Sequence, residues 1–345
     1  MGTILSALAA AAMTLTVSSA AGQQSSGFQI YSVRLDGGGL VNLSGGRGSD
    51  WAPSVSPNGR RIAFLRNPGP AGAELWVMNA DGSAQRHLAG GVLVDDFTQS
   101  PSWSPDGRSI GFVRSPGGDA TGLWVIGADG ADARRLGDAD AGPVWSPDGR
   151  LLAYETFDSS TCGPIDRNCA TAFLSVVRPD GTGNKVLAKE AIWPSWSPTG
   201  TRLVFAGGAS GTDTAEIEVV SAGGSPPRRV VPSSRGPFLA PAWSPSGRSI
   251  AFVGGIPFLR QSVYVVAPDG TRLRRLASGR SIGAVAWSPT GRRLAYARGD
   301  EGGRTSIWVM RSDGSHRRRL VRVGGRAVVY ALAWSRAGRL VFTVP

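Results

Sequence analysis

The segment Trp103-Ser104-Pro105-Asp106-Gly107-Arg108 decides the fold, because variants of it occur seven times in this chain. The copies are spaced by roughly 42 to 51 residues, and an apolar triplet similar to Ile-Ala-Phe follows most of them. The other six copies begin at Val55, Trp145, Trp196, Trp243, Trp287 and Trp334. A repeat of about 40 to 50 residues with turn residues at a fixed place is typical of the four-stranded blades of a β-propeller.

The turn residues of this segment predict a tight hairpin. Pro presets φ for the first corner of a type I turn, Asp, Asn, Ser or Thr suits the second corner, and Gly takes the left-handed position. The strand before each turn therefore ends near the Trp, and the strand after it is short and apolar, as in Arg61-Ile62-Ala63-Phe64. We interpret the repeated tryptophans as packing residues between blades rather than as ligand-stacking groups.

A second hairpin recurs between successive copies of the first. It is clearest in Leu75 to Gly82, Leu123 to Gly130 and Ile307 to Gly314, where an Asp-Gly turn follows an apolar strand. Less regular copies are Leu174 to Gly181, Ile217 to Gly224 and Val263 to Gly270. One hairpin of each type makes one blade of four strands.

The two ends of the chain each carry half a blade. Phe28 to Leu43 is a hairpin of the second type without a first, and Ala333 to Phe342 is a hairpin of the first type without a second. We expect the two to pair, which gives a seven-bladed all-β propeller and removes the free edges of an open ring. A six-bladed ring with an extra half repeat at each end is the alternative.

The Trp-Ser-Pro-Asp-Gly repeats resemble the TolB-like, WD40-like β-propeller repeat family, whose hallmark they are, over residues 28–345. The resemblance implies a propeller fold. It does not imply a single function, because the same repeat occurs in periplasmic TolB, in tricorn-like proteins and in propellers attached to prolyl-oligopeptidase-like enzymes. TolB itself carries an additional N-terminal α/β domain, for which we find no segment here, so the resemblance implies the propeller alone.

The first residues predict export. An apolar stretch from Ile4 to Val17 is followed by Ser18-Ser19-Ala20-Ala21, which offers a small-x-small cleavage pattern. We therefore assign residues 1–22 to a signal peptide, although no Lys or Arg precedes the apolar stretch; a disordered alanine-rich tail is the alternative. No other stretch has the roughly 18 apolar residues of a membrane span. We expect a periplasmic or secreted protein.

The only two cysteines, Cys162 and Cys169, lie in an insertion that lengthens the third blade. In an oxidising compartment such a pair is expected to form a disulfide that staples the loop. A metal site would need further ligands, and the only histidines are His87 and His316, at non-equivalent repeat positions. We expect both histidines on the surface, and we expect no metal and no cofactor.

The chain is strongly basic, with a formal net charge of +12. Many arginines follow the turn glycines, and others cluster on the outermost strands, at Arg134-Arg135, Arg228-Arg229, Arg272, Arg274-Arg275 and Arg317-Arg318-Arg319. We interpret these clusters as a solvated girdle that discourages pairing between sheet edges. An anionic cell-envelope polymer or lipid head group is the alternative partner. Nothing in the sequence indicates nucleic-acid binding.

We find no catalytic signature in the sequence. The pattern Gly-x-Ser-x-Gly occurs around Ser109 and around Ser281. A nucleophile elbow requires a turn from a strand into a helix and a downstream His partner, whereas Ser109 follows a repeat turn and Ser281 lies between blades. We therefore assign no catalytic residue, and a propeller lyase, a lactonase or the remnant of a peptidase gate remains the alternative.

Both short turns of each blade are expected on one face, so the opposite face carries the variable loops, where binding sites usually lie. The connections that lead into the blades carry acids in the first four repeats and bases in the last three. We expect these charges around the mouth of the central channel: Asp50, Asp95, Asp96, Asp138, Asp140, Glu190, Arg235, Arg280 and Arg326. A mouth with opposed charges suits a zwitterionic or peptide segment. The sequence thus predicts a monomeric, non-catalytic module that binds an envelope protein or peptide.

Overall fold

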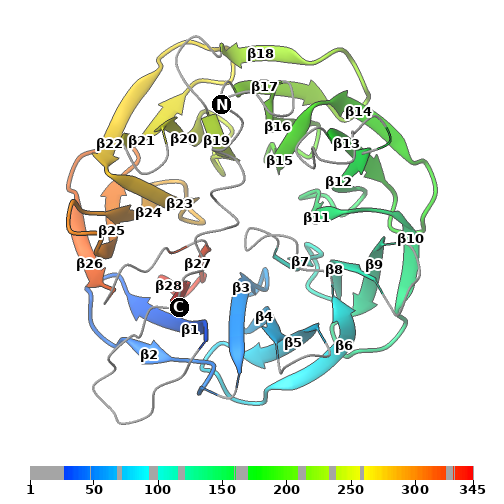
Figure 1. Cartoon of the computed structure of the whole chain (residues 1–345), viewed down its shortest axis with the longest axis horizontal. Helices are drawn as coiled ribbons and strands as arrows, with labels where there is room; N and C mark the ends of the chain where they lie inside the picture. Colours follow the sequence, from blue (N-terminus) through cyan, green and yellow to red (C-terminus); the bar gives the residue numbers. More distant parts are fainter. Residues whose placement is uncertain are drawn as a thin grey trace.

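The computed structural model describes residues 27–46, 48–67, 72–92, 100–115, 121–158, 160, 170–208, 215–232, 238–256, 260–323, 329 and 331–344. In this part of the chain every regular element is a β-strand, and the strands form antiparallel sheets arranged radially around a central axis (Figure 1). This is the architecture of a β-propeller, as expected from the repeats. The predicted signal peptide and the predicted cystine, Cys162 and Cys169, lie outside the described residues.

The strands form four concentric layers. The innermost strands are β3 (Ser49–Val55), β7 (Ser102–Trp103), β11 (Ala141–Trp145), β15 (Ala191–Trp196), β19 (Phe238–Trp243), β23 (Ser281–Trp287) and β27 (Leu332–Trp334). The second layer comprises β4 (Arg61–Asn67), β8 (Ser109–Arg114), β12 (Leu152–Asp158), β16 (Arg202–Gly207), β20 (Ile250–Ile256), β24 (Arg293–Gly299) and β28 (Arg339–Val344). The third comprises β5 (Ala73–Asn79), β9 (Gly122–Gly127), β13 (Thr171–Val177), β17 (Glu216–Ser221), β21 (Arg260–Val266), β25 (Thr305–Arg311) and β1 (Gln29–Arg34). The outermost strands are β6 (Arg86–Val92), β10 (Arg134–Asp138), β14 (Lys185–Lys189), β18 (Arg228–Val231), β22 (Arg274–Gly279), β26 (Arg318–Arg322) and β2 (Val41–Asn42).

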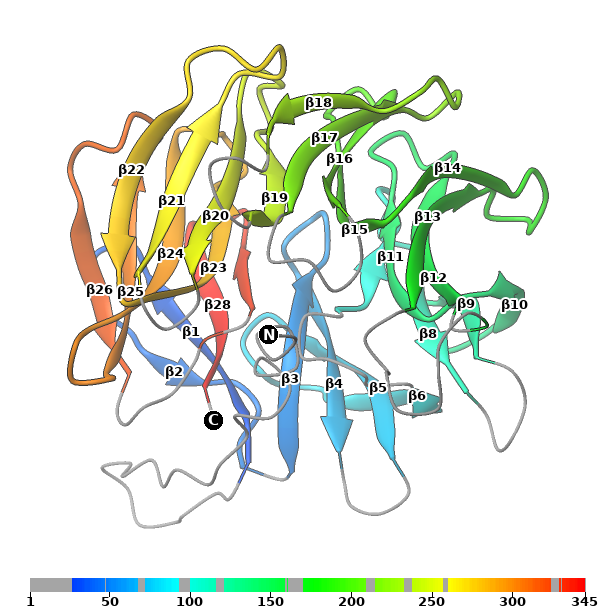
Figure 2. The ribbon, with the colours of Figure 1, turned by 45° about the horizontal axis from the view of Figure 1, so that its top comes forward.

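Five of the sheets contain four strands, and β3 to β10 form one larger sheet in which β6 and β8 meet at the single residue pair Val92 and Arg114. The sheets twist from the innermost to the outermost strand, as Figure 2 shows. The two ends of the chain share a sheet in the order β2-β1-β28-β27, with Gln29 opposite Val344 and Arg34 opposite Arg339. We call it the closing sheet; its pairing of terminal strands is the one predicted.

The core lies between neighbouring sheets. The aromatic residue of each apolar triplet is buried, and these residues are Phe64, Phe112, Tyr154, Phe205, Phe252, Tyr296 and Phe342. Four of the repeated tryptophans also donate to the preceding innermost strand: the indole N–H of Trp103 donates to the Ser54 carbonyl and that of Trp196 to the Val144 carbonyl, each at 2.9 Å, and Trp287 and Trp334 make the same bond. Their predicted role in packing between sheets is confirmed.

The short turns repeat one hydrogen-bond pattern. In the turn between β7 and β8, the Ser104 hydroxyl donates to Asp106 Oδ1 at 2.6 Å and accepts the Ser109 N–H at 2.9 Å, while Asp106 Oδ1 also accepts the Arg108 N–H. The repeated Ser is buried in each turn, where its hydroxyl accepts a backbone N–H. These turns and the Asp-Gly turns lie at one end of the sheets, the short-turn face; the other end is the loop-rich face.

The basic clusters on the outermost strands differ from the prediction. The first residue of an outermost strand donates to the turn carbonyls of the next set of four strands along the chain: Arg134 bonds to the Pro179 carbonyl at 3.0 and 3.2 Å, and Arg274 bonds to the Asp313 carbonyl at 2.9 Å. Arg86, Lys185 and Arg228 make the same contact. These side chains are exposed, but each bond joins one set of four strands to the next, and we call these bonds latches. The arginines that form them are therefore not a merely solvated girdle. His87 on β6 and His316 before β26 are exposed, as predicted.

Candidate functional site

Of the nine charges predicted to surround the channel mouth, five lie within the described residues: Asp50, Asp138, Asp140, Glu190 and Arg280. Asp95, Asp96, Arg235 and Arg326 lie outside them. The five do not form one cluster. Asp140 and Glu190 lead into the adjacent strands β11 and β15, whereas Arg280 leads into β23, and Figure 1 places β11 and β23 on opposite sides of the ring centre.

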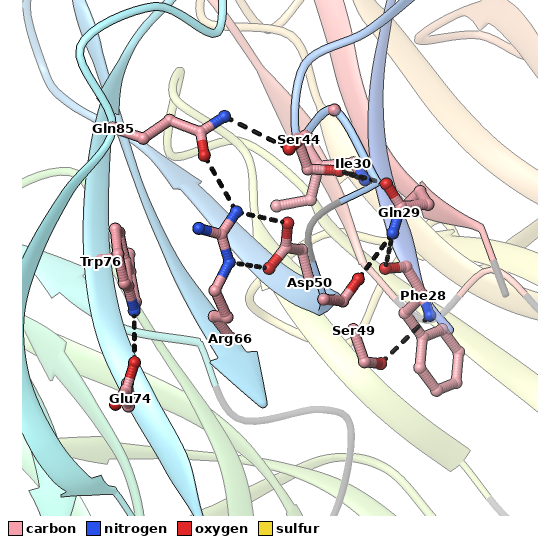
Figure 3. Close-up of polar contacts among 12 residues, drawn as sticks. Phe28, Gln29, Ile30, Ser44, Ser49, Asp50, Arg66, Glu74, Trp76 and Gln85 are labelled. Atoms are coloured by element: carbon pink, nitrogen blue, oxygen red, sulfur yellow. Dashed lines mark hydrogen bonds and ion pairs between the residues drawn. The ribbon is translucent and has the colours of Figure 1, made fainter. Parts of the chain in front are cut away.

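Asp50 differs from the prediction, because its side chain is buried rather than exposed at the mouth. Its two carboxylate oxygens accept hydrogen bonds from Arg66 Nε at 2.6 Å and Arg66 Nη2 at 2.8 Å (Figure 3). Burial raises the pKa of the Asp50 carboxyl, and the Arg66 guanidinium opposes that rise. The guanidinium also lies over the Trp76 ring at 4.5 Å. Asp50 is therefore half of a buried ion pair and is not available to an outside ligand.

This ion pair belongs to a network that reaches the closing sheet. Arg66 Nη2 donates to Gln85 Oε1 at 2.9 Å, and Gln85 Nε2 donates to the Leu43 carbonyl at 3.1 Å. Ser44, beside Leu43, donates from its hydroxyl to Gln29 Oε1 at 2.9 Å. Figure 3 shows these groups side by side between β4 and the N-terminal strands. The network ties the first residues of the ring to the sheet that follows them.

The acids of the adjacent strands are held in place but remain accessible. Asp140 is partly exposed, and its Oδ2 accepts the Phe157 N–H at 2.7 Å. Asp138 is exposed and pairs with Arg135 of its own strand. Glu190 is partly exposed and has a φ of 54°, a left-handed conformation that is uncommon for Glu. Asp138, Asp140 and Glu190 thus supply negative charge to one side of the loop-rich face.

Trp193 is a candidate that the sequence interpretation missed. The innermost strands carry a β-bulge at one place, where the bulged residues with positive φ are Ala52, Trp193 and Ala240, each followed by Pro. Ala suits this left-handed position far better than Trp, whose large side chain makes the conformation a marked outlier. Trp193 is partly exposed, and its backbone N–H donates to Glu155 Oε1 at 2.8 Å. The bulge therefore holds one large aromatic ring where other sheets have a methyl group.

The signal for Trp193 was present in the repeats. Pro53, Pro101, Pro143, Pro194 and Pro241 stand two residues before the residue that ends the innermost strand. The residue before that Pro is small or polar in every copy except Ile192-Trp193-Pro194. Aligning the copies on their prolines would have singled out Trp193, whereas counting the tryptophans as one class did not.

The basic side of the loop-rich face contains Arg280 and Arg298. Arg280 is exposed, and its Nη1 donates to the Glu301 carbonyl at 3.2 Å. Arg298 occupies on β24 the place that Arg66 occupies on β4, and its guanidinium lies over Trp308 at 5.6 Å. Arg298 lies opposite Ile282 on the neighbouring strand, whereas Arg66 lies opposite Asp50. The buried Nε of Arg298 has no acceptor among the described residues. Arg298 therefore lacks the internal carboxylate that satisfies Arg66.

The remaining predicted features carry no catalytic geometry in the described residues. Ser109 and Ser281 are the first residues of β8 and β23, and neither stands at a turn from a strand into a helix. Within the same residues, no group of three or more His, Cys, Asp or Glu side chains is placed to hold a metal ion. No helix in the described part of the chain has the length and apolar character to cross a membrane.

Comparison with solved structures places the fold among propellers of several functions. An oligogalacturonate lyase in complex with manganese is 14% identical with a TM-score of 0.69, over 92% of this chain and 96% of that one. TolB from Acinetobacter baumannii is 19% identical with a TM-score of 0.53, over 75% of this chain and 62% of that one. An acylaminoacyl peptidase from Pyrococcus horikoshii is 12% identical with a TM-score of 0.60, over 85% of this chain and 48% of that one.

These identities establish the fold alone. No curated protein sequence matches the chain. A family model described as the TolB beta propeller domain matches residues 24–178 and again residues 166–344, which together cover nearly all of the described sheets. The chain therefore belongs to the TolB β-propeller domain family.

Proposed function

We propose that this protein is an exported, non-catalytic binding module that holds an extended peptide segment of a cell-envelope protein on its loop-rich face. The observation that carries the proposal is Trp193, a partly exposed indole held in a left-handed conformation on an innermost strand. Such strain costs on the order of 1–3 kcal/mol and recurs at ligand-binding positions. Tryptophan is also the residue most often found to dominate the energy of protein interfaces.

The charges around Trp193 support a peptide with opposed ends. Asp140 and Glu190 lie on the same side of the ring as Trp193, and a Lys or Arg side chain of the partner is attracted both by the carboxylates and by the indole face. Arg280 and Arg298 lie across the ring, where Arg298 Nε has no acceptor among the described residues. Arg298 is partly exposed, and the accessible part of its guanidinium can pair with an acidic group of the partner.

The proposal includes a ring of seven blades. Its support is the geometry of the larger sheet: β3 to β6 and β7 to β10 each repeat the four-strand order of the other sheets, and one residue pair joins the two sets. Counted as two blades beside the other five sheets, they make seven. The closing sheet is then the blade shared by the two ends of the chain.

Fluorescence polarisation with short labelled peptides tests the proposed site. A library of zwitterionic peptides, basic at one end and acidic at the other, should bind better than all-acidic or all-basic libraries of equal length. Salt should weaken the binding, because charge pairs at the surface are screened within about 10 Å at 0.1 M ionic strength. Glu190→Lys and Arg280→Glu should each reduce the affinity, whereas Arg248→Glu, an exposed turn position on the other face, should not. Equal loss in all three variants would contradict the proposal.

The alternative of a propeller enzyme is tested separately. Incubation with oligogalacturonate and manganese should yield no unsaturated product, and a fluorophosphonate probe should leave Ser109 and Ser281 unlabelled. Turnover or stoichiometric labelling would establish the enzyme instead.

Export is tested by thiol chemistry. Protein purified from an oxidising compartment should react with an alkylating reagent at Cys162 and Cys169 only after reduction, as a disulfide requires. Two thiols that react in the native protein would argue against both the disulfide and export.

A further inference from the structure

The junction between strands β23–β26 and the closing sheet has a basic residue in the place of a latch but no latch bond among the described residues. At five successive places, the first residue of an outermost strand donates a hydrogen bond to a turn carbonyl of the next set of four strands, from Arg86, Arg134, Lys185, Arg228 and Arg274. Arg318 stands first on β26 and faces the closing sheet in the same way. Within the described residues, its side chain makes no hydrogen bond or ion pair. The junction between β23–β26 and the closing sheet therefore lacks its latch.

A cavity of about 290 Å³ lies beside this unlatched side chain. Its described lining comes from the short-turn ends of β24, β25 and β26 and from the turn before β26: Arg293, Val309, Met310, Arg311, His316 and Arg318. Four of these six side chains are basic. A volume at the lower end of the range for small-molecule sites suits one compact group rather than a large ligand.

The strand register explains why the three arginines converge. Arg293 on β24 is directly opposite Arg311 on β25, and Arg318 on β26 is opposite Val309, two residues before Arg311. Residues opposite each other or two apart point to the same face of a sheet. Val309 packs in one core cluster with Val33 and Leu340 of the closing sheet, so this face is the one turned toward the closing sheet.

The nearby carboxylates form no ion pair with the three arginines, although Arg318 helps to lower the pKa of Asp36 and Arg311 that of Asp313. Asp36 in the closing sheet accepts the Gly38 N–H at 2.8 Å and pairs with Arg34, and Asp313 accepts the Ser315 N–H at 2.8 Å. Neither comes within ion-pair distance of Arg293, Arg311 or Arg318. Like charges placed opposite each other on neighbouring strands are destabilising, although the exposure of these three side chains to water weakens the repulsion. A bound anion would replace this repulsion by attraction to each arginine.

We infer that this cavity is a binding site for a phosphoryl group, held by the guanidinium groups of Arg293, Arg311 and Arg318 with His316 at its side. Several guanidinium groups match the tetrahedral oxygens of a phosphate better than the two oxygens of a carboxylate, and each donates charge-assisted hydrogen bonds. The group is supplied either by a small soluble phosphate compound or by the head group of an anionic lipid. The site is on the short-turn face and is independent of the peptide site proposed for the loop-rich face.

Isothermal titration calorimetry of the full chain tests the site with two probes: inorganic pyrophosphate, and vesicles of phosphatidylglycerol in phosphatidylcholine. Saturable binding with a stoichiometry near one is expected for pyrophosphate. The double variant Arg293→Gln/Arg318→Gln should weaken it at least about tenfold. The matched control Arg248→Gln/Arg150→Gln removes the same charge from exposed turns of other sheets and should leave the affinity unchanged. The melting temperature of each variant shows whether it remains folded.

The two probes distinguish the source of the phosphoryl group. Binding of pyrophosphate alone identifies a soluble ligand, and binding of the vesicles as well, with the same loss in the double variant, identifies a lipid head group. Absence of binding to both probes would overturn the inference. Equal weakening by the control variant would overturn it too, because the protein would then respond only to bulk positive charge.

Discussion

The two faces of the ring are built from the same strands but differ in how far they keep the repeat. On the short-turn face, the bonds around Ser104 and Asp106 recur in turn after turn, and the latch of Arg134 recurs at five junctions. On the loop-rich face, equivalent places hold different residues: Asp50 beside Arg66, Trp193 in one bulge and Ile282 beside Arg298. Repetition thus marks the scaffold, and departures from it mark places with a separate role.

The residues that depart from the repeat are of two kinds, which differ in how far their side chains are buried. Asp50 is buried and completely paired, and its network reaches the closing sheet, so this departure serves ring closure. Trp193 is partly exposed and strained, and the buried Nε of Arg298 has no acceptor among the described residues, so we assign these departures to the proposed peptide site. The phosphoryl site fits the same rule, because it lies at a junction of the short-turn face that has no latch bond among the described residues.

The largest effect is expected from removing the terminal strands. Deleting residues 28–43 from a parent that begins at residue 27 removes all six paired residues opposite β28 and exposes that edge. We expect the melting temperature to fall by about 10 °C or more, because the change costs several kcal/mol. An unchanged melting curve would show that the closing sheet is dispensable and would remove the support for seven blades.

The next effect distinguishes buried from exposed ion pairs. Asp50→Ala leaves Arg66 charged and buried without its carboxylate, so the free energy of unfolding in urea should fall by about 3–5 kcal/mol. The control is Arg304→Ala, which breaks the exposed pair with Asp300 but keeps the bond from the Arg304 N–H to Asp300, and should cost no more than about 0.5 kcal/mol. Similar losses in the two variants would mean that the Asp50 network does not hold the closing sheet.

The latches should have a smaller, distributed effect. Replacing Arg86, Arg134, Arg228 and Arg274 together by Gln should lower the free energy of unfolding by about 2–4 kcal/mol, because widely spaced hydrogen bonds contribute additively. The matched variant changes Arg60, Arg108, Arg150 and Arg248, which follow the turn glycines, and should be nearly neutral. If both variants lose the same stability, the outer arginines act only as solvated charge, as the sequence had suggested.

The smallest effect is the loss of stability that we expect at low pH, when the carboxylates of the short turns become protonated. The Ser104 hydroxyl and the Arg108 N–H hold the pKa of Asp106 below its ordinary value, and the Ser83 hydroxyl and N–H do the same for Asp81. Because these values are lowered in the folded state, their stabilisation is complete above the unfolded value of 3.8 and is lost as the pH falls through the folded values. Urea unfolding should therefore show stability declining below about pH 4.

Asp106→Asn is the variant that tests this cause. Asn58 already makes the equivalent bonds in the first turn, accepting the Ser56 hydroxyl at 2.9 Å and the Arg60 N–H at 3.0 Å. The variant should therefore fold normally and lose stability less steeply with falling pH. An identical decline would assign the acid sensitivity to other groups.

Much of the fold could be predicted because each hairpin is specified locally. The turn residues determine where strands begin and end, and the half repeats at Phe28 and Ala333 predicted the closing sheet. The latches could not be predicted, since Arg134 and Pro179 are 45 residues apart and meet only through the twist and spacing of neighbouring sheets. Burial of Asp50 was missed because its charge was considered alone, although the hairpin register places it opposite Arg66.

Trp193 is the residue on which the proposed peptide site depends most, and one substitution tests its role directly. Trp193→Ala gives the bulge the residue that Ala52 and Ala240 provide in other sheets. Because the backbone of Trp193 is strained there, the free energy of unfolding should change by less than about 1 kcal/mol, whereas truncating a core aromatic costs about 3–5 kcal/mol. In polarisation assays, the best zwitterionic peptide should bind the variant at least about tenfold more weakly. A large loss of stability with unchanged peptide affinity would show that Trp193 is a packing residue, and the proposed peptide site would be wrong.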